Sequence, residues 1–297
     1  MKWTNGFCLI CIFLCGTLSE GVNAQTEKLM KRADSLFDSG NYFEASIAYE
    51  RVYFVAEVPL ARITANLKKT QALKQLGEYE KAHGDLRRSL TYRGEDSLRL
   101  EVLYEMAICA YLGGDPDDAY GLLRQFRHLS GEGSGQRVYL LEGLALAELM
   151  QWDALSDHLE NWVLNFSDDT GLADEKLQRF AEILTEKDQQ ARRDPEKARL
   201  WSALIPGSGQ VYAGEAGWGL LNAFSQLASL GAFSAMALNG YYVAAVFAGL
   251  GPFQSFYFGG IRQAGLMAEA HEKSRREKTL AAVREFLFNL EEELGAE

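Results

Sequence analysis

The chain has 297 residues and a formal net charge of −11, with 47% hydrophobic and 24% charged residues. The acidic charge lies within residues 25–190, whereas residues 201–261 contain a single charged side chain, Glu215. A strongly acidic segment argues against non-specific nucleic-acid binding, which needs Lys and Arg to replace phosphate counterions. We therefore expect no nucleic-acid partner.

Residues 1–24 are expected to form a signal peptide. Lys2 supplies the positive start, and residues 7–18 form an apolar stretch that is too short to span a bilayer comfortably. Val22-Asn23-Ala24 then gives a small-x-small cleavage site. The alternative is an uncleaved N-terminal anchor.

Cleavage would also decide the cysteine chemistry of the mature chain. It would leave Cys109 as the single cysteine, because it would remove Cys8, Cys11 and Cys15. The mature chain would then have no internal disulfide and no Cys-rich metal site.

Residues 25–166 contain a repeat. Gly40, Gly77 and Gly114 follow one another at intervals of 37 residues, and five residues after each comes an alanine: Ala45, Ala82 and Ala119. A fixed period of this size is typical of stacked helix pairs. The glycine would end the first helix in a left-handed conformation, and the alanine would let the second helix approach closely.

Two residues after the three glycines come Tyr42, Tyr79 and Pro116. A fourth, degenerate copy is expected over residues 136–166, with Trp152 at the position of the two tyrosines and Leu155 in place of the alanine. The Gly-x-Tyr-x-x-Ala spacing resembles the tetratricopeptide repeat family, although each unit here is about three residues longer than the family period. The resemblance implies an all-α solenoid that binds a protein or peptide partner on the concave face of its first helices.

We choose the candidate groove residues by their positions in the first helix of each repeat. They are Phe37, Gln71, Lys74, Tyr104, Ile108, Tyr111, Arg137 and Leu144. The alternative is that the aromatic and aliphatic members pack between repeats. Phe37, Tyr104 and Tyr111 are favoured, because their slots normally face the groove.

Residues 167–200 are expected to form a capping helix and a connector. The helix is predicted over residues 172–191, and Pro195 ends it. A solenoid needs such a cap on its last repeat.

Residues 201–261 predict a membrane hairpin. Residues 218–238 and 241–261 are two uncharged stretches of 21 residues, joined by Asn239-Gly240. Each is long enough to cross a hydrocarbon core of about 30 Å. The alternative is a buried helical hairpin in a soluble domain. Within a bilayer, three amides would need polar partners: Asn222, Gln226 and Gln254.

The entry to this hairpin is the most specific local motif. Residues 205–217 read IPGSGQVYAGEAG. They resemble the Pro-Gly-x-Gly-Gln-x-Tyr-x-Gly entry of a family of two-helix membrane domains in bacterial envelope proteins. The matching residues are Pro206, Gly207, Gly209, Gln210, Tyr212 and Gly214. The resemblance implies topology rather than chemistry. We expect a non-helical turn that Gln210 and Tyr212 tie to the start of the first spanning helix.

Motifs for catalysis and metal binding are missing. The nucleophile elbow Gly-x-Ser-x-Gly is absent, since Pro206 and Gln210 flank Gly207-Ser208-Gly209. The four histidines are scattered, which makes a zinc site improbable. We predict no enzyme, no metal and no cofactor, and an enzyme with an unrecognised site is the weakest alternative.

Residues 262–297 predict an amphipathic C-terminal helix. Its apolar residues step by three and four positions: Leu280, Val283, Leu287, Leu290 and Leu294. This helix would dock on the repeats, pair with a second copy or lie on the membrane.

The signal peptide and the basic residues around the hairpin predict opposite topologies. The signal places the repeats and the C-terminus in the periplasm, whereas Arg192, Arg193 and Arg262 favour the cytoplasm by the positive-inside tendency. We give the signal more weight, because large domains translocate largely regardless of charge. The basic residues would then meet anionic lipid headgroups.

The sequence therefore predicts a scaffold or adaptor that is tethered to the bacterial inner membrane and holds a protein or peptide partner in the periplasm. The alternative is a transport or insertion component that forms homo-oligomers through the hairpin, with the repeats as its recruiting arm. Small residues in the hairpin would allow that packing, among them Gly231 and Gly249.

Overall fold

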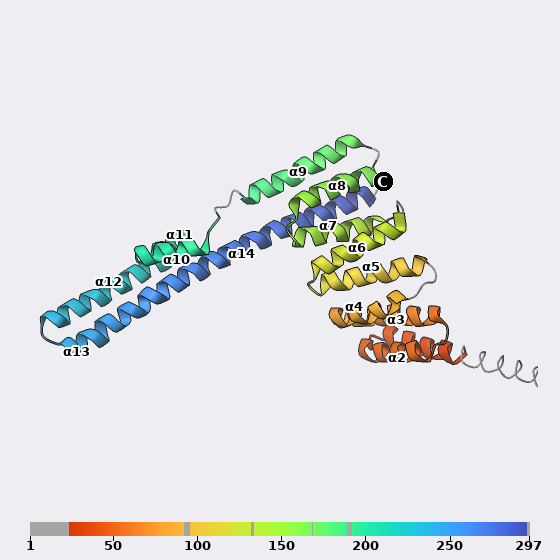
Figure 1. The fold of residues 1–297 in the computed structure, drawn as a ribbon, viewed down its shortest axis with the longest axis horizontal. Coiled ribbons are helices and arrows are strands. Elements are labelled where there is room, and N and C mark those ends of the chain that lie inside the picture. Colours follow the sequence, from red (N-terminus) through yellow and green to blue (C-terminus); the bar gives the residue numbers. More distant parts are fainter. Residues whose placement is uncertain (1–23, 92–95, 132–133, 168, 189–191, 296–297) are drawn as a thin grey trace, which may run out of the picture. The chain divides into compact units, whose positions relative to one another are not determined.

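The computed structural model describes residues 24–91, 96–131, 134–167, 169–188 and 192–295. Every regular element in these ranges is a helix, which confirms the all-α prediction (Figure 1). The predicted signal peptide, apart from Ala24, lies outside the described residues. The chain divides into two units, which we describe separately: residues 1–173 with 287–297, and residues 174–286.

Unit 1 is built from successive helices, each packed on the next. A first helix covers residues 24–38. It is followed by α2 (Tyr42–Val55), α3 (Pro59–Gln75), α4 (Tyr79–Arg87) with the 3₁₀ turn η1 (Arg88–Thr91), α5 (Asp96–Leu112), α6 (Pro116–Ser130), α7 (Gln136–Glu148) and α8 (Trp152–Phe166). The predicted fourth copy, residues 136–166, coincides with α7 and α8.

One turn recurs within the helix pairs of unit 1. Gly40, Gly77 and Gly114 all have the predicted left-handed conformation, with φ of 78°, 73° and 84°. The next amide donates to a carbonyl five residues earlier, at 3.0 Å, 3.0 Å and 2.9 Å respectively, which closes the end of the first helix. In the fourth pair Met150 takes the glycine's place with φ of 55°, and its neighbour makes the same bond at 3.0 Å.

The small residue five positions after the turn lies in the helix contact. Ala45, Ala82 and Ala119 are fully buried, as is Leu155 at the corresponding position of the fourth pair. The surrounding core is apolar, and its largest buried side chains in unit 1 are Leu73, Leu86, Leu103, Met106, Leu123, Leu146, Leu159 and Trp162. Each such side chain contributes about 1.5–3 kcal/mol by burial. Packing of this kind stabilises unit 1 in the absence of any disulfide that involves Cys109.

Unit 2 contains most of α9 (Thr170–Asp188), then α10 (Pro195–Leu204), α11 (Ser208–Tyr212), α12 (Ala216–Leu238), α13 (Tyr242–Ala245), the π-helical segment η3 (Val246–Leu250) and the first part of α14 (Gly251–Gly295). The helix α14 runs without a break across residue 262, where the sequence predicted a new element, because neither proline nor a left-handed glycine interrupts residues 253–294. The predicted capping helix corresponds to α9, and the last three residues of its predicted range lie outside the described residues.

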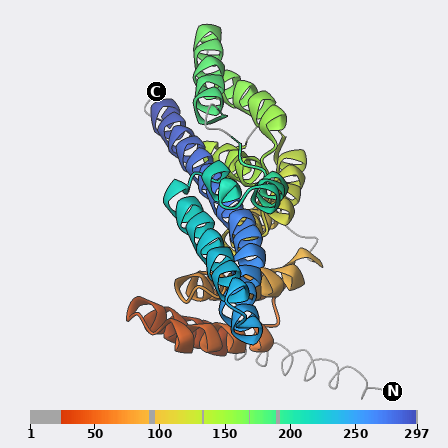
Figure 2. The same cartoon turned by 90° about the vertical axis from the view of Figure 1, so that its left-hand side faces the viewer.

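The same turn appears twice in unit 2. Gly214 and Gly240 are left-handed, with φ of 91° and 80°, and the amides that follow them donate to carbonyls five residues earlier at 2.8 Å and 2.9 Å. Gly219 and Ala245 occupy the small position and are buried. The turn that was predicted at Asn239-Gly240 is present. After it the chain returns, so that α12 and the start of α14 lie side by side (Figures 1 and 2).

Candidate functional site

The structure brings only some of the predicted groove residues of unit 1 to one place. Phe37 is half-buried in a small cluster with Ala33, Ala45 and Tyr49, and its ring lies edge-on to Tyr42 with centroids 5.3 Å apart. It therefore packs within the first helix pair.

Two predicted polar groove residues are engaged within unit 1. The amide of Gln71 donates to Oε1 of Glu105 at 3.0 Å, and Nζ of Lys74 bonds to Oε2 of the same carboxylate at 2.6 Å. The Lys74 and Glu105 side chains are only 17% and 13% exposed. This pair links α3 to α5, so it acts between repeats.

Three other predicted groove residues with apolar or aromatic side chains pack mainly inside unit 1. Ile108 and Tyr111 are partly buried against the main core cluster. Leu144 is buried at 6% exposure, so its assignment to an open groove is wrong. It lies in α7, a helix whose residues 141–147 are all buried.

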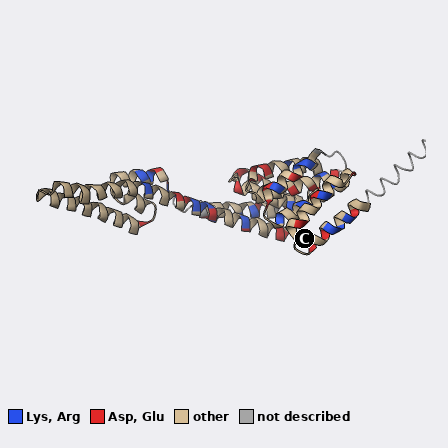
Figure 3. Cartoon of the chain, turned by 90° about the horizontal axis from the view of Figure 1, so that it is seen from below, with Lys and Arg blue, Asp and Glu red and all other residues tan. Residues whose placement is uncertain are grey.

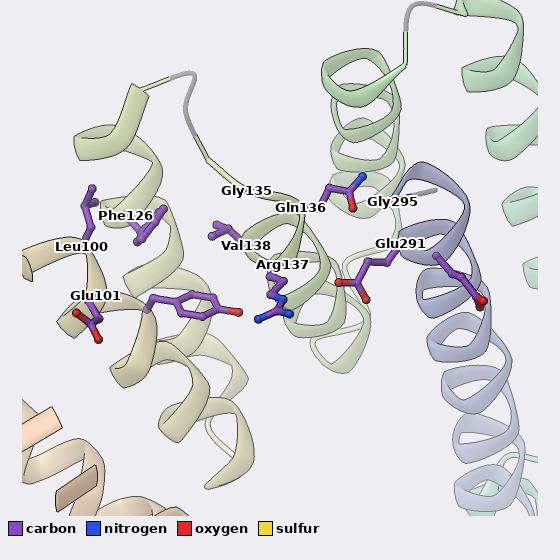
Figure 4. Close-up of a pocket in the computed structure, with 11 residues that line it drawn as sticks. Leu100, Glu101, Phe126, Gly135, Gln136, Arg137, Val138, Glu291 and Gly295 are labelled. Atoms are coloured by element: carbon purple, nitrogen blue, oxygen red, sulfur yellow. The ribbon is translucent and has the colours of Figure 1, made fainter. Parts of the chain in front are cut away.

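Tyr104 and Arg137 do meet, at a cavity of about 980 Å³. Leu100, Phe126 and Val138 form its apolar side, and the other side chains that line it are polar or charged. The full lining consists of Leu100, Glu101, Tyr104, Phe126, Gly135, Gln136, Arg137, Val138, Glu291, Glu292 and Gly295. In Figure 4, Arg137 of α7 and Glu291 of α14 are both directed into this space. Helices α5, α6, α7 and the end of α14 together form the site.

The end of α14 forms one wall of this cavity. Leu287, Leu290 and Leu294 are buried, which agrees with docking on the repeats, one of the three outcomes that the sequence left open. A Cβ atom at Gly143 of α7 would lie 3.4 Å from a methyl group of Leu287. The sequence did not show that this tail completes the candidate site, because the heptad-like pattern gives a helix face without its partner.

The charges of the cavity are mostly acidic. Three carboxylates line it, those of Glu101, Glu291 and Glu292, against the single guanidinium of Arg137. Burial raises the pKa of the Tyr104 phenol; Arg137 opposes this shift, while Glu105 and Glu291 add to it. The phenol therefore remains a neutral hydrogen-bond donor among these charges.

Cys109 lies in the same helix as Tyr104 but does not reach the cavity. It is fully buried with Leu73 and Ala82. Burial raises the pKa of its thiol to about 12, with Lys74 opposing and Glu105 adding to the shift. The thiol therefore stays protonated and packs as a small apolar group.

The second candidate feature is the surface of unit 2. By length and composition α12 is the only described helix able to cross a bilayer, and 17% of its most apolar 18-residue stretch is buried. Large apolar side chains on α12, α13 and η3 are 66–78% exposed, namely Leu220, Phe224, Leu227, Val243 and Phe247. The predicted second stretch, residues 241–261, is helical but divided among α13, η3 and α14. Figure 3 shows this region almost without charged residues.

Unit 2 buries several polar side chains beside a cluster of small apolar ones. Gln210 is fully buried; its Nε2 donates to the carbonyl of Gly260 at 2.8 Å, and its Oε1 accepts from Ser202 Oγ at 3.3 Å. Gln226, at 1% exposure, donates to Asn222 Oδ1 at 3.1 Å. Asn222 and Gln226 therefore bond to each other inside the helix pair, although Nδ2 of Asn222 and Oε1 of Gln226 have no hydrogen-bond partner. Gln254, the third amide that the sequence expected to need an interior partner, is exposed.

The entry motif makes different contacts from those that we expected. Gln210 reaches α14 rather than α12, and the hydroxyl of Tyr212 accepts from the backbone amide of Asp194 at 3.1 Å. The contact with α12 comes from Gly207, whose Cβ would collide with the backbone of Gly219. The turn at residues 205–207 is non-helical as predicted, but residues 208–212 form the short helix α11.

Among the described residues, no three His, Cys, Asp or Glu side chains are grouped so that they could hold a metal ion. A scan of protein-family models finds no match for this chain, and neither does a search of curated proteins. The two family resemblances in the sequence therefore stay predictions.

Proposed function

We propose that this chain is a membrane-tethered scaffold, in which unit 1 binds a protein or peptide partner and unit 2 holds it in the inner membrane of a bacterial envelope. The observation that carries the proposal is the exposed apolar surface of α12, of which little is buried within the protein. Water would penalise that surface, whereas acyl chains would accept it.

The buried amides of unit 2 support the same environment. In a bilayer, amide side chains must face the interior of a helix bundle and bond to one another or to backbone carbonyls. Asn222 and Gln226 lie on the buried side of α12, while Phe224 and Leu227 of the same helix are exposed. A water-soluble helix would show the reverse distribution.

Unit 1 supports the partner-binding half of the proposal. Its helix pairs repeat one turn and one close contact, in agreement with a tetratricopeptide-like solenoid, an architecture suited to binding peptides. The cavity at Tyr104 combines an apolar wall with three carboxylates. We infer a partner segment in which apolar and basic side chains alternate.

The partner can be tested with two fluorescein-labelled decapeptides, one of alternating Leu and Lys and one of alternating Leu and Glu, titrated onto the full chain in non-ionic detergent. Binding of the Leu–Lys peptide is expected to weaken at least about tenfold when Glu101, Glu291 and Glu292 are all changed to Gln. The matched control neutralises three exposed acids of α8: Asp153, Asp157 and Glu160. Equal weakening in both variants, or no preference between the peptides, would refute this assignment.

The topology is tested by protease digestion of sealed spheroplasts that carry a tag at the C-terminus. Digestion of both the repeats and the tag is expected if unit 1 is periplasmic. Protection of both would place unit 1 in the cytoplasm and overturn the signal-peptide interpretation, since the basic residues around the hairpin would then follow the positive-inside tendency.

A homo-oligomeric transport component remains the second candidate, because Gly231 of α12 has open space around it and could meet another copy. Gly249 cannot report on this, because its Cβ would lie 2.6 Å from the Cα of Phe233 within the same hairpin. Gly231→Leu should therefore abolish detergent-stable oligomers if this function is correct, while the folded monomer persists.

A further inference from the structure

We infer that residues 195–212 form a re-entrant helical hairpin whose tip is embedded in the lipid bilayer beside the spanning helices. This inference rests on the proposed membrane function of unit 2. Its partner is the lipid: acyl chains around the tip and headgroups around its two ends. The sequence alone placed this segment partly in a connector and partly in an entry turn.

The contacts of α10 on α14 set its direction. Midway along α10, Arg199 lies against Gly265 and pairs with Glu269, whereas near its end the carbonyl of Ala203 accepts from the hydroxyl of Tyr257 at 3.1 Å. The contacts therefore move towards the start of α14 as α10 proceeds, and the four residues from Arg199 to Ala203 themselves rise about 6 Å at 1.5 Å per residue. Because Tyr257 lies in the uncharged stretch and Glu269 lies beyond it, α10 runs from the charged region into the apolar one.

The chain then turns and comes back. Gly207 sits against Gly219 and Ala223 of α12, and after α11 the hydroxyl of Tyr212 returns to the amide of Asp194, just before α10. Asn222 of α12 lies against Gly260 of α14, so the part of α12 that contacts Gly207 lies beside residues of α14 close to Tyr257. The contacts with the two helices therefore place the tip at the same depth. The deepest part of the hairpin is therefore residues 204–207.

The polarity of the exposed side chains changes along the hairpin, from charged at its outer ends to apolar at its tip. Those near the tip that face away from the protein are apolar and 47–68% exposed: Leu200, Trp201, Leu204, Ile205 and Val211. Most charged residues lie at the two outer ends, namely Arg193, Asp194, Glu196, Lys197 and Glu215. Arg199, midway along α10, is paired with Glu196 and Glu269. An exposed apolar tip below a charged belt matches the profile of a bilayer from acyl chains to headgroups.

The backbone at the tip is also satisfied without water. The last carbonyls of a helix have no partner within the helix, and in hydrocarbon each free one costs several kcal/mol. The carbonyl of Trp201 accepts from the amide of Ile205 at 2.9 Å, that of Ile205 accepts from the amide of Ser208 at 3.1 Å, and that of Ala203 accepts from the hydroxyl of Tyr257. The Ser208 hydroxyl, which has one proton to donate, lies 2.6 Å and 2.8 Å from the oxygens of Trp201 and Ile205, so these three carbonyls all have partners within the protein.

The test is cysteine labelling in nanodiscs, where both membrane faces are open to a polar maleimide. Single cysteines replace Leu204 at the tip, Lys197 at the outer end and Leu227 on α12, in a chain whose four native cysteines are alanine. All three positions are exposed in the protein, so the substitutions leave the packing intact and only the lipid can protect them. Rates are normalised to those in denaturing detergent.

Leu204→Cys is expected to react at least about tenfold more slowly than Lys197→Cys, close to the rate of Leu227→Cys. A fast reaction of Leu204→Cys with a slow reaction of Leu227→Cys would overturn the re-entrant hairpin while leaving the spanning helix in place. Fast reaction at all three positions would overturn the proposed membrane function itself, and this inference with it.

Discussion

In unit 1 the turns after Gly40, Gly77 and Gly114 join helices that bury leucines and expose charges. In unit 2 the same turn, after Gly214 and Gly240, joins helices that bury amides and expose leucines and phenylalanines. The turn is identical because it depends on backbone geometry alone: a left-handed residue and a bond across six residues. The two surfaces differ in composition, and under our proposal unit 1 faces water while unit 2 faces lipid.

The polar side chains that the two units bury also differ, since charged ones are among them in unit 1 and those of unit 2 are neutral. Unit 1 buries charge: Lys69, at 7% side-chain exposure, lies 2.6 Å from a carboxylate oxygen of Glu50 and 2.5 Å from one of Asp85. Unit 2 buries neutral amides, with Gln210 fully covered. A buried ion pair is costly to break, whereas a neutral amide avoids the large desolvation cost of a charge in lipid.

The largest expected effect follows from breaking that ion pair. Lys69→Met should destabilise the protein by about 3 kcal/mol, since it removes the buried cation and leaves Glu50 and Asp85 with the more exposed Arg88, which lies 3.2 Å and 2.9 Å from them. The measurement is urea unfolding of the full chain in detergent, followed by circular dichroism. Lys68→Met is the matched control: its pair with Asp34 is 41% and 36% exposed and should cost less than about 1 kcal/mol. Equal losses would mean that the buried pair contributes no more than the surface one.

The next effect tests the shared turn. The small position holds an alanine in three turns of unit 1 but Gly219 in unit 2, where a Cβ would lie 2.5 Å from the carbonyl oxygen of Gly207. Gly219→Ala should therefore destabilise unit 2 by about 1–3 kcal/mol, because the backbone of Gly207 has to move. The denaturing-detergent fraction at half-unfolding measures the change. Gly217→Ala, in open space on the same helix, should have little effect, and a similar loss there would contradict the steric explanation.

The turns and the helix pairs were predictable from sequence because their causes are local. Glycine is the residue that takes a positive φ without strain, so the spacing of Gly40, Gly77 and Gly114 located three turns before any packing was known. The fourth was harder, because Met150 carries the left-handed conformation with no glycine to mark it. Trp152 and Leu155 identified that copy only through their register.

The candidate site was less predictable, because its causes are distant in the sequence. Tyr104 and Arg137 were named from repeat position, but the cavity also needs Glu291 and Glu292, more than 150 residues further along the chain than Arg137. Likewise Gln210 bonds to Gly260, and a single motif carries no information about that partner. Asp194-Pro195 was the signal for α10 that the sequence interpretation missed: the Asp194 side chain caps the new helix and Pro195 is its first residue, whereas Pro195 was interpreted only as the end of the preceding helix.

A smaller effect concerns pH and unit 1. His158 is buried, donates from Nε2 to the carbonyl of Tyr139 at 2.8 Å and stacks on its ring. Burial lowers the pKa of His158 below its usual 6.5, and Arg127 adds to this, while Glu142 and the Tyr139 carbonyl oppose it. Near pH 6.5 the unfolded chain therefore binds a proton at His158 more readily than the folded chain does. As a result, the free energy of unfolding decreases as the pH drops through 6.5.

The midpoint of urea unfolding, measured between pH 7.5 and 5.5, should decrease for the natural chain. It should decrease less for His158→Gln, which keeps an N–H donor for Tyr139 but has no titrating group. If both proteins lose the same stability over that range, another group titrates and the burial of His158 is not the cause.

The smallest expected effect separates the conformation of the turn from its packing. Met150 has φ of 55°, a conformation that costs an L-residue about 1–2 kcal/mol and glycine nothing comparable. Met150→Gly should therefore stabilise the fourth pair, but by only about 0.5 kcal/mol, because glycine loses more backbone entropy and the half-buried methionine side chain gives up some contacts.

The reciprocal change at Gly77, where a Cβ would meet nothing within 4 Å, isolates the conformational part. Gly77→Ala should lower the thermal midpoint by a few degrees, consistent with about 1 kcal/mol for a domain of this size. A loss of stability in Met150→Gly that equals the loss in Gly77→Ala would show that methionine packing, rather than the left-handed backbone, decides the fourth turn. The fourth pair would then be held by the contacts between its own helices, α7 and α8, and not by the turn that the other pairs share.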